Sequence, residues 1–292
     1  MARDDRPIGV FDSGIGGLTV LKEIFRALPG ENTIYLGDTA RVPYGSKSGE
    51  TVVRYSLEIA EFLVKQGIKL FVVACNTASA YAIPELKKRL KIPVIGVIEP
   101  GAKAAIEATR TKRVGIIGTE GTIKSNSYVN AINALMNNKT ENIIEHGEKS
   151  LDRYFEIRSG DFVIFTKACP LFVSLAEEGW TSNDIALLTA EHYLRGIKKE
   201  NPDTLVLGCT HYPVLKDAIS KVMGPEIKLI DSAVETVKVI GDILKNRNIL
   251  RDSTEKPSRK FYVTDSPERF VKVGERFLEQ KIEYIEKIVV SC

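Results

Sequence analysis

Two of the four cysteines, Cys75 and Cys209, stand in matching local settings. Each follows a short apolar run and one small residue, in the segments Val72–Thr77 and Val206–His211. Such a run is typical of a buried strand, so each thiol should lie at the carboxyl end of a strand, where open α/β sheets bind ligands. Two thiols facing each other across a cleft could take a proton from one face of a carbon and return one to the other. The pair therefore indicates inversion of a stereocentre.

The residues after the two cysteines could favour a thiolate. They are hydrogen-bonding residues: Asn76, Thr77, Thr210 and His211. A free thiol has a pKa of about 8.5, so one thiolate with one thiol is reachable near neutral pH once such donors favour the anion. In an extended segment, His211 would point to the same side as Cys209 and could orient that thiol. The ordinary alternatives are a cysteine buried as a small apolar side chain and a histidine that only packs in the core or a loop.

A glycine-rich turn, Asp12–Gly17, follows the first strand-like run. Its glycines could let the backbone approach a ligand, and its amides could hold an anion. A dinucleotide-binding pattern, however, requires glycine where the chain has Thr19, and the Asp12 carboxylate would repel a pyrophosphate. Asp12, with Ser13 beside it, is better suited to a ligand ammonium group or to a catalytic proton. The alternative is an aspartate that caps the following helix.

Several other polar residues receive no catalytic role from local sequence. Cys169 lacks the strand-end setting and is expected to be structural, and the last residue, Cys292, is expected to be inert. Tyr44, in a proline-containing turn, could close over a ligand or pack against the surface. Glu177 and Glu178 are typical of a solvated helix end. With three histidines and neither His-Glu-x-x-His nor Cys-x-x-Cys, the sequence predicts no metal site and no disulfide framework.

The elements that must position these residues alternate between strand and helix. Amphipathic segments such as 51–66 and 81–90 separate the apolar runs. The strand-like runs are Ile8–Phe11, Thr33–Leu36, Leu70–Ala74, Val94–Val97, Val114–Ile117 and Leu205–Leu207. This βαβ rhythm, with about 25–40 residues between strands, predicts an α/β fold with mainly parallel sheets and right-handed crossovers.

The length of 292 residues favours two domains. We place domain one at residues 1–99 together with about 214–292, and domain two at residues 100–213. The polar tract 125–161 is expected to form surface helices or an excursion, and we assign it no chemistry.

Composition excludes several classes of partner. The net charge of +3 is too balanced for a nucleic-acid-binding surface, which leaves a small molecule as the expected partner. Charged residues interrupt every apolar run well before the roughly 20 residues that a membrane-spanning helix needs. The charged start of the chain is unlike a signal peptide, so we expect a cytoplasmic protein with free thiols.

Five blocks, in order along the chain, closely resemble the glutamate racemases, cofactor-independent enzymes that supply D-glutamate for the bacterial cell wall. The blocks are Phe11–Leu18, Gly37–Thr39 with Pro43–Gly45, Ala74–Ala78, Ala168–Val173 and Leu207–Pro213. The resemblance implies two similar three-layer α/β domains, related by a pseudo-two-fold axis, with glutamate bound in the cleft between them. It also implies a homodimer.

The resemblance further implies roles for individual residues. Cys75 and Cys209 would be the two catalytic thiols, with Asp12 assisting one thiol and with Glu177 and His211 assisting the other. The resemblance adds hydroxyl residues that line the family's cleft, Thr119 and Thr122. The residues implied to contact the substrate are Asp12, Ser13, Tyr44, Gly45, Asn76, Thr77, Thr210 and His211.

Three rival functions stay open at this point. A racemase for aspartate or for a hydantoin would also use paired cysteines in a similar fold. A nucleotide-binding module could be built on the turn Asp12–Gly17. A redox dithiol protein would require Cys75 and Cys209 to come within disulfide reach, with Cα atoms less than about 7 Å apart.

Overall fold

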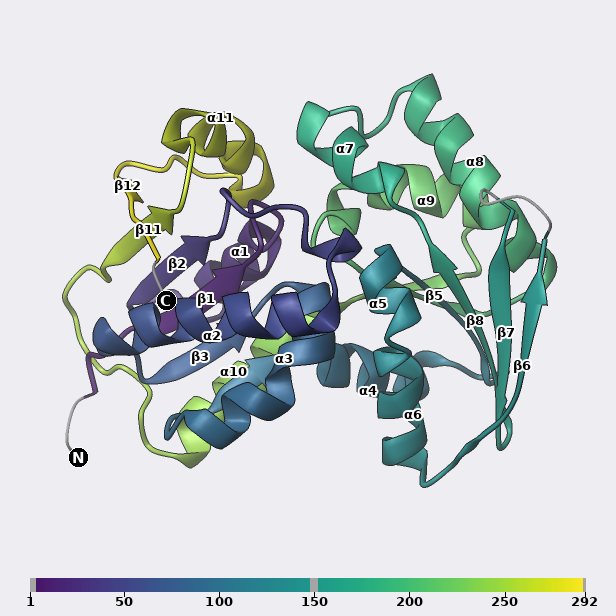
Figure 1. The fold of residues 1–292 in the computed structure, drawn as a ribbon, viewed down its shortest axis with the longest axis horizontal. Helices are drawn as coiled ribbons and strands as arrows, with labels where there is room; N and C mark the ends of the chain where they lie inside the picture. The colour runs from purple at the N-terminus through teal and green to yellow at the C-terminus, as the bar shows by residue number, and fades with distance from the viewer. Residues whose placement is uncertain (1–3, 148–151, 291–292) are drawn as a thin grey trace. The chain divides into compact units, whose positions relative to one another are not determined.

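The computed structural model describes residues 4–147 and 152–290. These residues form two compact units, each an α/β structure with its own six-stranded sheet (Figure 1). Unit 1 contains the described residues up to Val97 and those from Ala233 onward, and unit 2 contains those from Ile98 to Ser232. The predicted α/β class with mainly parallel sheets is confirmed.

Every strand pair in the sheet of unit 1 is parallel, in the order β12-β11-β2-β1-β3-β4. The strands are β1 (Ile8–Asp12), β2 (Thr33–Gly37), β3 (Leu70–Val73), β4 (Val94–Gly96), β11 (Arg259–Val263) and β12 (Glu286–Lys287). The helices are α1 (Leu18–Ala27), η1 (Tyr44–Ser46), α2 (Gly49–Lys65), α3 (Asn76–Arg89), α10 (Ser232–Asn246) and α11 (Pro267–Leu278). The central strand β1 is buried along its whole length, as expected of a parallel strand covered on both faces.

The sheet of unit 2 has the order β10-β9-β5-β8-β7-β6, and the pairs made by β7 are antiparallel. The strands are β5 (Arg113–Gly118), β6 (Thr140–His146), β7 (Tyr154–Ser159), β8 (Phe162–Ala168), β9 (Thr204–Gly208) and β10 (Lys228–Asp231). The helices are α4 (Ile98–Ala108), α5 (Glu120–Lys124), α6 (Ser127–Met136), α7 (Leu171–Glu178), α8 (Asp184–Lys199), η2 (Tyr212–Leu215) and α9 (Lys216–Met223).

Two glycines show that helices cover both faces of this sheet. A Cβ added to Gly208 in β9 would lie 3.1 Å from the ring of Tyr128 in α6. A Cβ added to Gly115 in β5 would lie 3.2 Å from Ile197 in α8. Gly118 in β5 is the register partner of Gly208, so the two residues face the same side of the sheet. Gly115 stands three residues before Gly118 in the same strand and therefore faces the other side. Helices α6 and α8 thus pack on opposite faces of the sheet.

The tract 125–161 forms the helix α6 and the antiparallel strands β6 and β7, apart from residues 148–151, which lie outside the described residues. The strands extend the parallel part of the sheet at the β8 edge. The sequence analysis placed the return to domain one near residue 214. In the structure, the segment up to Asp231 still belongs to unit 2, because β10 pairs with β9.

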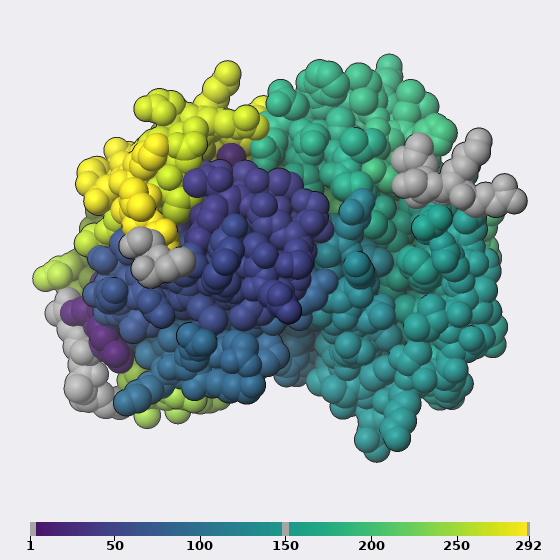
Figure 2. All heavy atoms as spheres, viewed as in Figure 1, coloured from purple at the N-terminus to yellow at the C-terminus, as the bar shows by residue number. Residues whose placement is uncertain are grey.

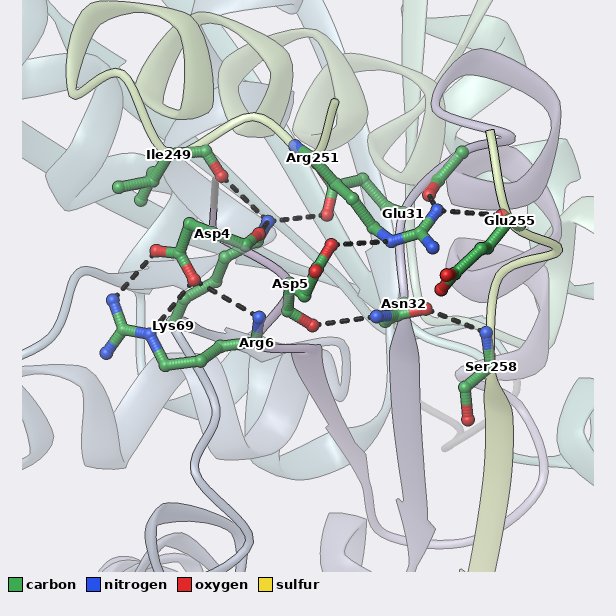
Figure 3. A network of polar contacts seen from close by, with 11 residues as sticks. Asp4, Asp5, Arg6, Glu31, Asn32, Lys69, Ile249, Arg251, Glu255 and Ser258 are labelled. Atoms are coloured by element: carbon green, nitrogen blue, oxygen red, sulfur yellow. Dashed lines mark hydrogen bonds and ion pairs between the residues drawn. The ribbon is translucent and has the colours of Figure 1, made fainter. Parts of the chain in front are cut away.

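The C-terminal part of unit 1 is attached to the N-terminal part by strand pairing and by a buried polar network. Strand β11 pairs with β2, and in Figures 1 and 2 the yellow C-terminal residues lie against the purple and blue ones. Figure 3 shows the network, in which the buried Lys69 ammonium lies 2.7 Å from the Glu31 carboxylate. Lys69 also donates to the carbonyls of Asp4 (3.0 Å) and Ile249 (2.7 Å). The Glu31 carboxylate accepts from the backbone N–H of Arg251 (2.7 Å).

Candidate active site

Cys75 lies at the carboxyl edge of the sheet of unit 1, directly after Val73 and Ala74 at the end of β3. It is the N-cap residue of α3, where its Sγ accepts from the backbone N–H of Ala78 at 3.4 Å. The thiol also donates to Ser13 Oγ, at 3.4 Å. A helix N-terminus and a neighbouring hydroxyl are surroundings in which a thiolate is well accommodated. The strand-end position predicted for this cysteine is therefore what the structure shows.

Asp12 ends β1, the strand beside β3, and is fully buried. Its Oδ2 accepts from the backbone N–H of Gly14 at 2.8 Å. The N-cap of α1 is Gly17, so Asp12 does not cap that helix. Gly17 packs so tightly on Asp12 that an added Cβ would lie 2.5 Å from the Asp12 Cβ. The turn therefore holds one buried carboxylate beside the Cys75 strand.

Tyr44 is buried rather than on the surface, with 1% of its area exposed. Its ring packs edge-on against Phe11, and its hydroxyl donates to Asp38. Asp38 also accepts from Arg41 Nε (2.7 Å) and Thr264 Oγ1 (2.9 Å). Burial, together with the neighbouring Asp38 carboxylate, raises the pKa of Tyr44 far above its usual range. These bonds hold the turn that includes Gly45.

Asp38 is a residue for which the sequence analysis stated no role. It directly follows β2 at the same edge of the sheet as Asp12, and it is fully buried. The sequence pattern that could have identified Asp38 is a carboxylate directly after an apolar, strand-like run, which is the pattern that identified Asp12.

Cys209 lies at the carboxyl edge of the sheet of unit 2, directly after β9. Its Sγ is 3.9 Å from Nδ1 of His211, and Nε2 of His211 is 3.2 Å from Oε1 of Glu177. Burial lowers the pKa of His211, but its bonds to Cys209 and Glu177, together with their negative charge, raise it to about 10. These contacts therefore favour the protonated form of the His211 imidazole beside Cys209.

The reason that the sequence analysis gave for the contact between Cys209 and His211 is wrong. The segment is not extended there, because His211 has helical backbone angles, φ −81° and ψ −26°, at the start of η2. The turn nevertheless brings the imidazole back to the thiol. Glu177 lies near the end of α7 but is more than a solvated helix end, since it contacts His211, 34 residues away in the chain.

The remaining predicted residues lie near these two centres, each within its own unit. Asn76 and Thr77 form the buried first turn of α3, and Thr210 is buried beside Cys209. Thr119 caps α5, with Oγ1 accepting from the N–H of Thr122 at 3.3 Å and lying 3.0 Å from the Thr122 hydroxyl. The sequence thus predicted two sets of residues, and each set gathers at the carboxyl edge of one sheet.

Cys169 also follows a strand, so the expectation that it lacks this setting is wrong. The strand β8 ends at Ala168, and its polar residues Thr166 and Lys167 hid the pattern. The Cys169 side chain is fully buried, and burial raises the pKa of its thiol far above the usual value. This thiol is unsuited to act as a base. Cys292 lies outside the described residues.

Residues 4–147 and 152–290 contain neither a metal-binding cluster of side chains nor a membrane-spanning helix. They contain no cluster of three or more histidine, cysteine, aspartate or glutamate side chains arranged to hold a metal ion. In the same part of the chain, no helix combines the length and the apolar character required to cross a membrane.

Comparison with known proteins identifies the family. Residues 8–152 match the profile of the family described as Asp/Glu/Hydantoin racemase. A glutamate racemase of Geobacter metallireducens is 54% identical over 287 residues, which is 98% of each chain. The structure resembles a glutamate racemase of Bacillus anthracis, with a TM-score of 0.87, 38% identity and 98% of each chain covered. It also resembles a Francisella tularensis glutamate racemase in complex with D-glutamate, with a TM-score of 0.85, 37% identity and 98% of each chain covered. With such similarity over nearly its whole length, this chain belongs to the glutamate racemases of the aspartate/glutamate racemase family.

Proposed function

We propose that this protein interconverts L- and D-glutamate without a cofactor, using Cys75 and Cys209 as the two acid/base groups. The observation that carries the proposal is the matched placement of the thiols. Each follows a buried strand that pairs in parallel with both of its neighbours, and each has a hydrogen-bonding side chain of its own, Ser13 or His211. Membership of the racemase family supports the same reaction, and the Francisella relative in complex with D-glutamate supports the substrate.

In this mechanism one cysteine is a thiolate and the other a thiol. The thiolate takes the Cα proton of glutamate, and the thiol gives its proton to the opposite face of the same carbon. After one turnover the two cysteines have exchanged protonation states, so the reverse reaction begins from the product. The proposal requires that the two thiols reach opposite faces of one Cα.

The assisting residues differ between the two thiols. Protonated His211 would stabilise the Cys209 thiolate, and Glu177 would keep that imidazole protonated and oriented. Asp12 would assist on the Cys75 side, and the Ser13 hydroxyl would donate to that thiolate. The remaining proposed substrate contacts are Tyr44, Gly45, Asn76, Thr77, Thr119, Thr122 and Thr210. Hydroxyl and backbone donors of this kind would stabilise the carbanion-like state through its carboxylate.

The rival functions have less support. An aspartate racemase homologue of Pyrococcus horikoshii shares 14% identity and a TM-score of 0.53, and a Klebsiella pneumoniae allantoin racemase 16% and 0.55, which is similarity of fold alone. A nucleotide-binding role is disfavoured because the Asp12 carboxylate itself accepts from Gly14 N–H within the glycine-rich turn.

The proposal extends to the protein's role in the cell. We propose that it supplies D-glutamate for peptidoglycan synthesis in the cytoplasm, where a reducing environment keeps such cysteines as free thiols. We also propose a homodimer. Four large apolar side chains of the α7–α8 region, each about half exposed, support an interface there: Leu171, Trp180, Ile185 and Leu188.

The test follows Cα deuterium incorporation by NMR and the handedness of glutamate by circular dichroism, in D2O with L-glutamate and no added cofactor. Wild-type protein should give deuterated D-glutamate, and L-aspartate should react far more slowly. Cys75→Ala and Cys209→Ala should each abolish racemisation, whereas Cys292→Ala, the control, should not. Racemisation at near wild-type rate in either of the first two variants would refute the two-thiol mechanism. If the protein instead racemises aspartate faster than glutamate, the proposed function is aspartate racemisation.

A further inference from the structure

The block Ala168–Val173 belongs to the resemblance but supplies none of the proposed catalytic groups. It covers the end of β8 and the start of α7, the helix that carries Glu177. Helix α7 has eight residues, of which Phe172, Leu175 and Ala176 are buried. Isolated helices of this length are marginal in water, so contacts with the rest of unit 2 must set the direction of α7.

Three buried aromatic residues provide those contacts. The Phe172 ring lies between two tyrosine rings, with centroid distances of 5.2 Å to Tyr193 and 5.3 Å to Tyr212. Both pairs are nearly perpendicular, at 84° and 86°, the edge-to-face geometry that aromatic rings favour. All three side chains are at most 3% exposed. Tyr193 comes from α8, and Tyr212 is the residue directly after His211.

Both tyrosine hydroxyls also bond the backbone where α7 begins. Tyr212 donates to the carbonyl of Cys169 at 2.9 Å, and the N–H of Leu171 donates to the Tyr193 hydroxyl at 3.2 Å. The start of α7 is thus held from two sides, by rings that contact Phe172 and by hydroxyls that bond its neighbours. Of these two tyrosines, Tyr212 directly follows His211 in the chain.

The contact between Glu177 and His211 depends on this arrangement, and a small displacement of α7 would break it. The distance of 3.2 Å between His211 Nε2 and Glu177 Oε1 is already at the long end of the hydrogen-bond range. The distance of 3.9 Å between Cys209 Sγ and His211 Nδ1 is long as well. A displacement of α7 by about half an ångström away from η2 would therefore break the Glu177 contact.

We propose that Phe172, Tyr193 and Tyr212 form an aromatic clamp of positioning residues that holds Glu177 against His211 and so prepares Cys209 for proton transfer. The relevance to catalysis rests on the proposed racemase function. The clamp itself makes no contact with the reacting atoms. Loosening it should change how His211 titrates and how fast glutamate turns over, while leaving glutamate binding nearly unchanged.

The test compares Tyr212→Phe, Tyr193→Phe and Phe172→Leu with Tyr154→Phe. The first two remove one hydroxyl and keep the ring, and the third removes the central ring. Tyr154→Phe is a matched control, because it removes a tyrosine hydroxyl of the same unit that donates to Glu200 (2.8 Å) instead of to the start of α7. Far-UV circular dichroism establishes that each variant is folded, and the two phenylalanine variants remain informative if Phe172→Leu does not fold.

The first measurement is the pKa of His211 by NMR, without substrate, in a chain that has only three histidines to assign. We expect Phe172→Leu to lower the pKa of His211 by at least one unit, Tyr212→Phe and Tyr193→Phe by smaller amounts, and Tyr154→Phe not at all. The proposal would be overturned if the pKa of His211 in the clamp variants stayed at the wild-type value. It would also be overturned if Tyr154→Phe lowered that pKa as much as the clamp variants do.

The second measurement is the pH profile of racemisation. We expect kcat to fall about tenfold in Phe172→Leu with KM for glutamate within twofold, and the high-pH limb of the profile to move with the pKa of His211. A change confined to KM would overturn a positioning role. If wild-type protein does not racemise glutamate at all, the proposed function fails, whereas the NMR titration still decides whether the clamp positions His211.

Discussion

The buried pair of Lys69 and Glu31 gives the sharpest prediction about stability. The Lys69 side chain is fully buried and that of Glu31 is 2% exposed. We consider Lys69→Met, which keeps most of the side-chain volume and removes the charge. Within the network drawn in Figure 3, the substitution leaves the buried Glu31 carboxylate with the backbone N–H of Arg251 as its hydrogen-bond donor, and it leaves two carbonyls without the ammonium.

The size of the effect follows from the loss of one partner only. Removing one member of a buried ion pair costs about 3–5 kcal/mol, since the other charge stays desolvated. The remaining bond from Arg251 places the expected loss at the lower end, about 3–4 kcal/mol. In urea, with a slope of about 2 kcal/mol per molar, the unfolding midpoint of unit 1 should fall by about 1.5–2 M. Adding Glu31→Gln should restore about half of the loss, since no buried charge then remains.

The assay is urea unfolding followed by far-UV circular dichroism, which reports both units, and by tryptophan fluorescence. The single tryptophan, Trp180, lies in unit 2 and reports that unit. The matched control is Lys22→Met, which breaks the more exposed pair with Glu279 and should cost less than about 1 kcal/mol. A cost for Lys69→Met no greater than for the control, or no recovery in the double variant, would refute the reasoning.

Three further predictions concern the active-site groups. The pKa of His211 is about 10 in the folded chain and about 6.5 in the unfolded chain. Protonation of His211 therefore stabilises the fold fully below pH 6.5. This contribution falls by about 1.4 kcal/mol for each pH unit above pH 6.5 and is lost above pH 10. Glu177→Gln should therefore destabilise the protein in urea more at pH 6 than at pH 10.5; an equal loss at both pH values would contradict this. Ser13→Ala removes the hydroxyl beside Cys75 and should lower kcat about fivefold, the equivalent of one hydrogen bond of about 1 kcal/mol, in a steady-state assay. Thr119→Ala removes the α5 cap and should cost about 1 kcal/mol by Trp180 fluorescence in urea, while Thr119→Ser should cost little.

The local positions of most candidate groups follow from the amino-acid sequence alone. An apolar run of strand length predicts a buried strand, so the residue at the end of the run lies at the carboxyl end of that strand, as Cys75, Cys209 and Asp12 do. The same rule missed the strand that ends before Cys169, because Thr166 and Lys167 interrupt its apolar pattern. Local sequence therefore predicts a strand end when apolar residues alone form the strand.

Contacts between residues far apart in the chain depend on how the elements pack. Nothing near Glu177 indicates that it meets His211, because the contact joins α7 to the turn after β9, 34 residues away. The burial of Tyr44 depends on Asp38 and Phe11, which lie outside its own short helix. The raised pKa of His211 likewise results from groups that only packing brings together. The sequence specifies which residues end each strand, whereas the fold decides which of them meet, since a contact requires two elements to be packed at one place.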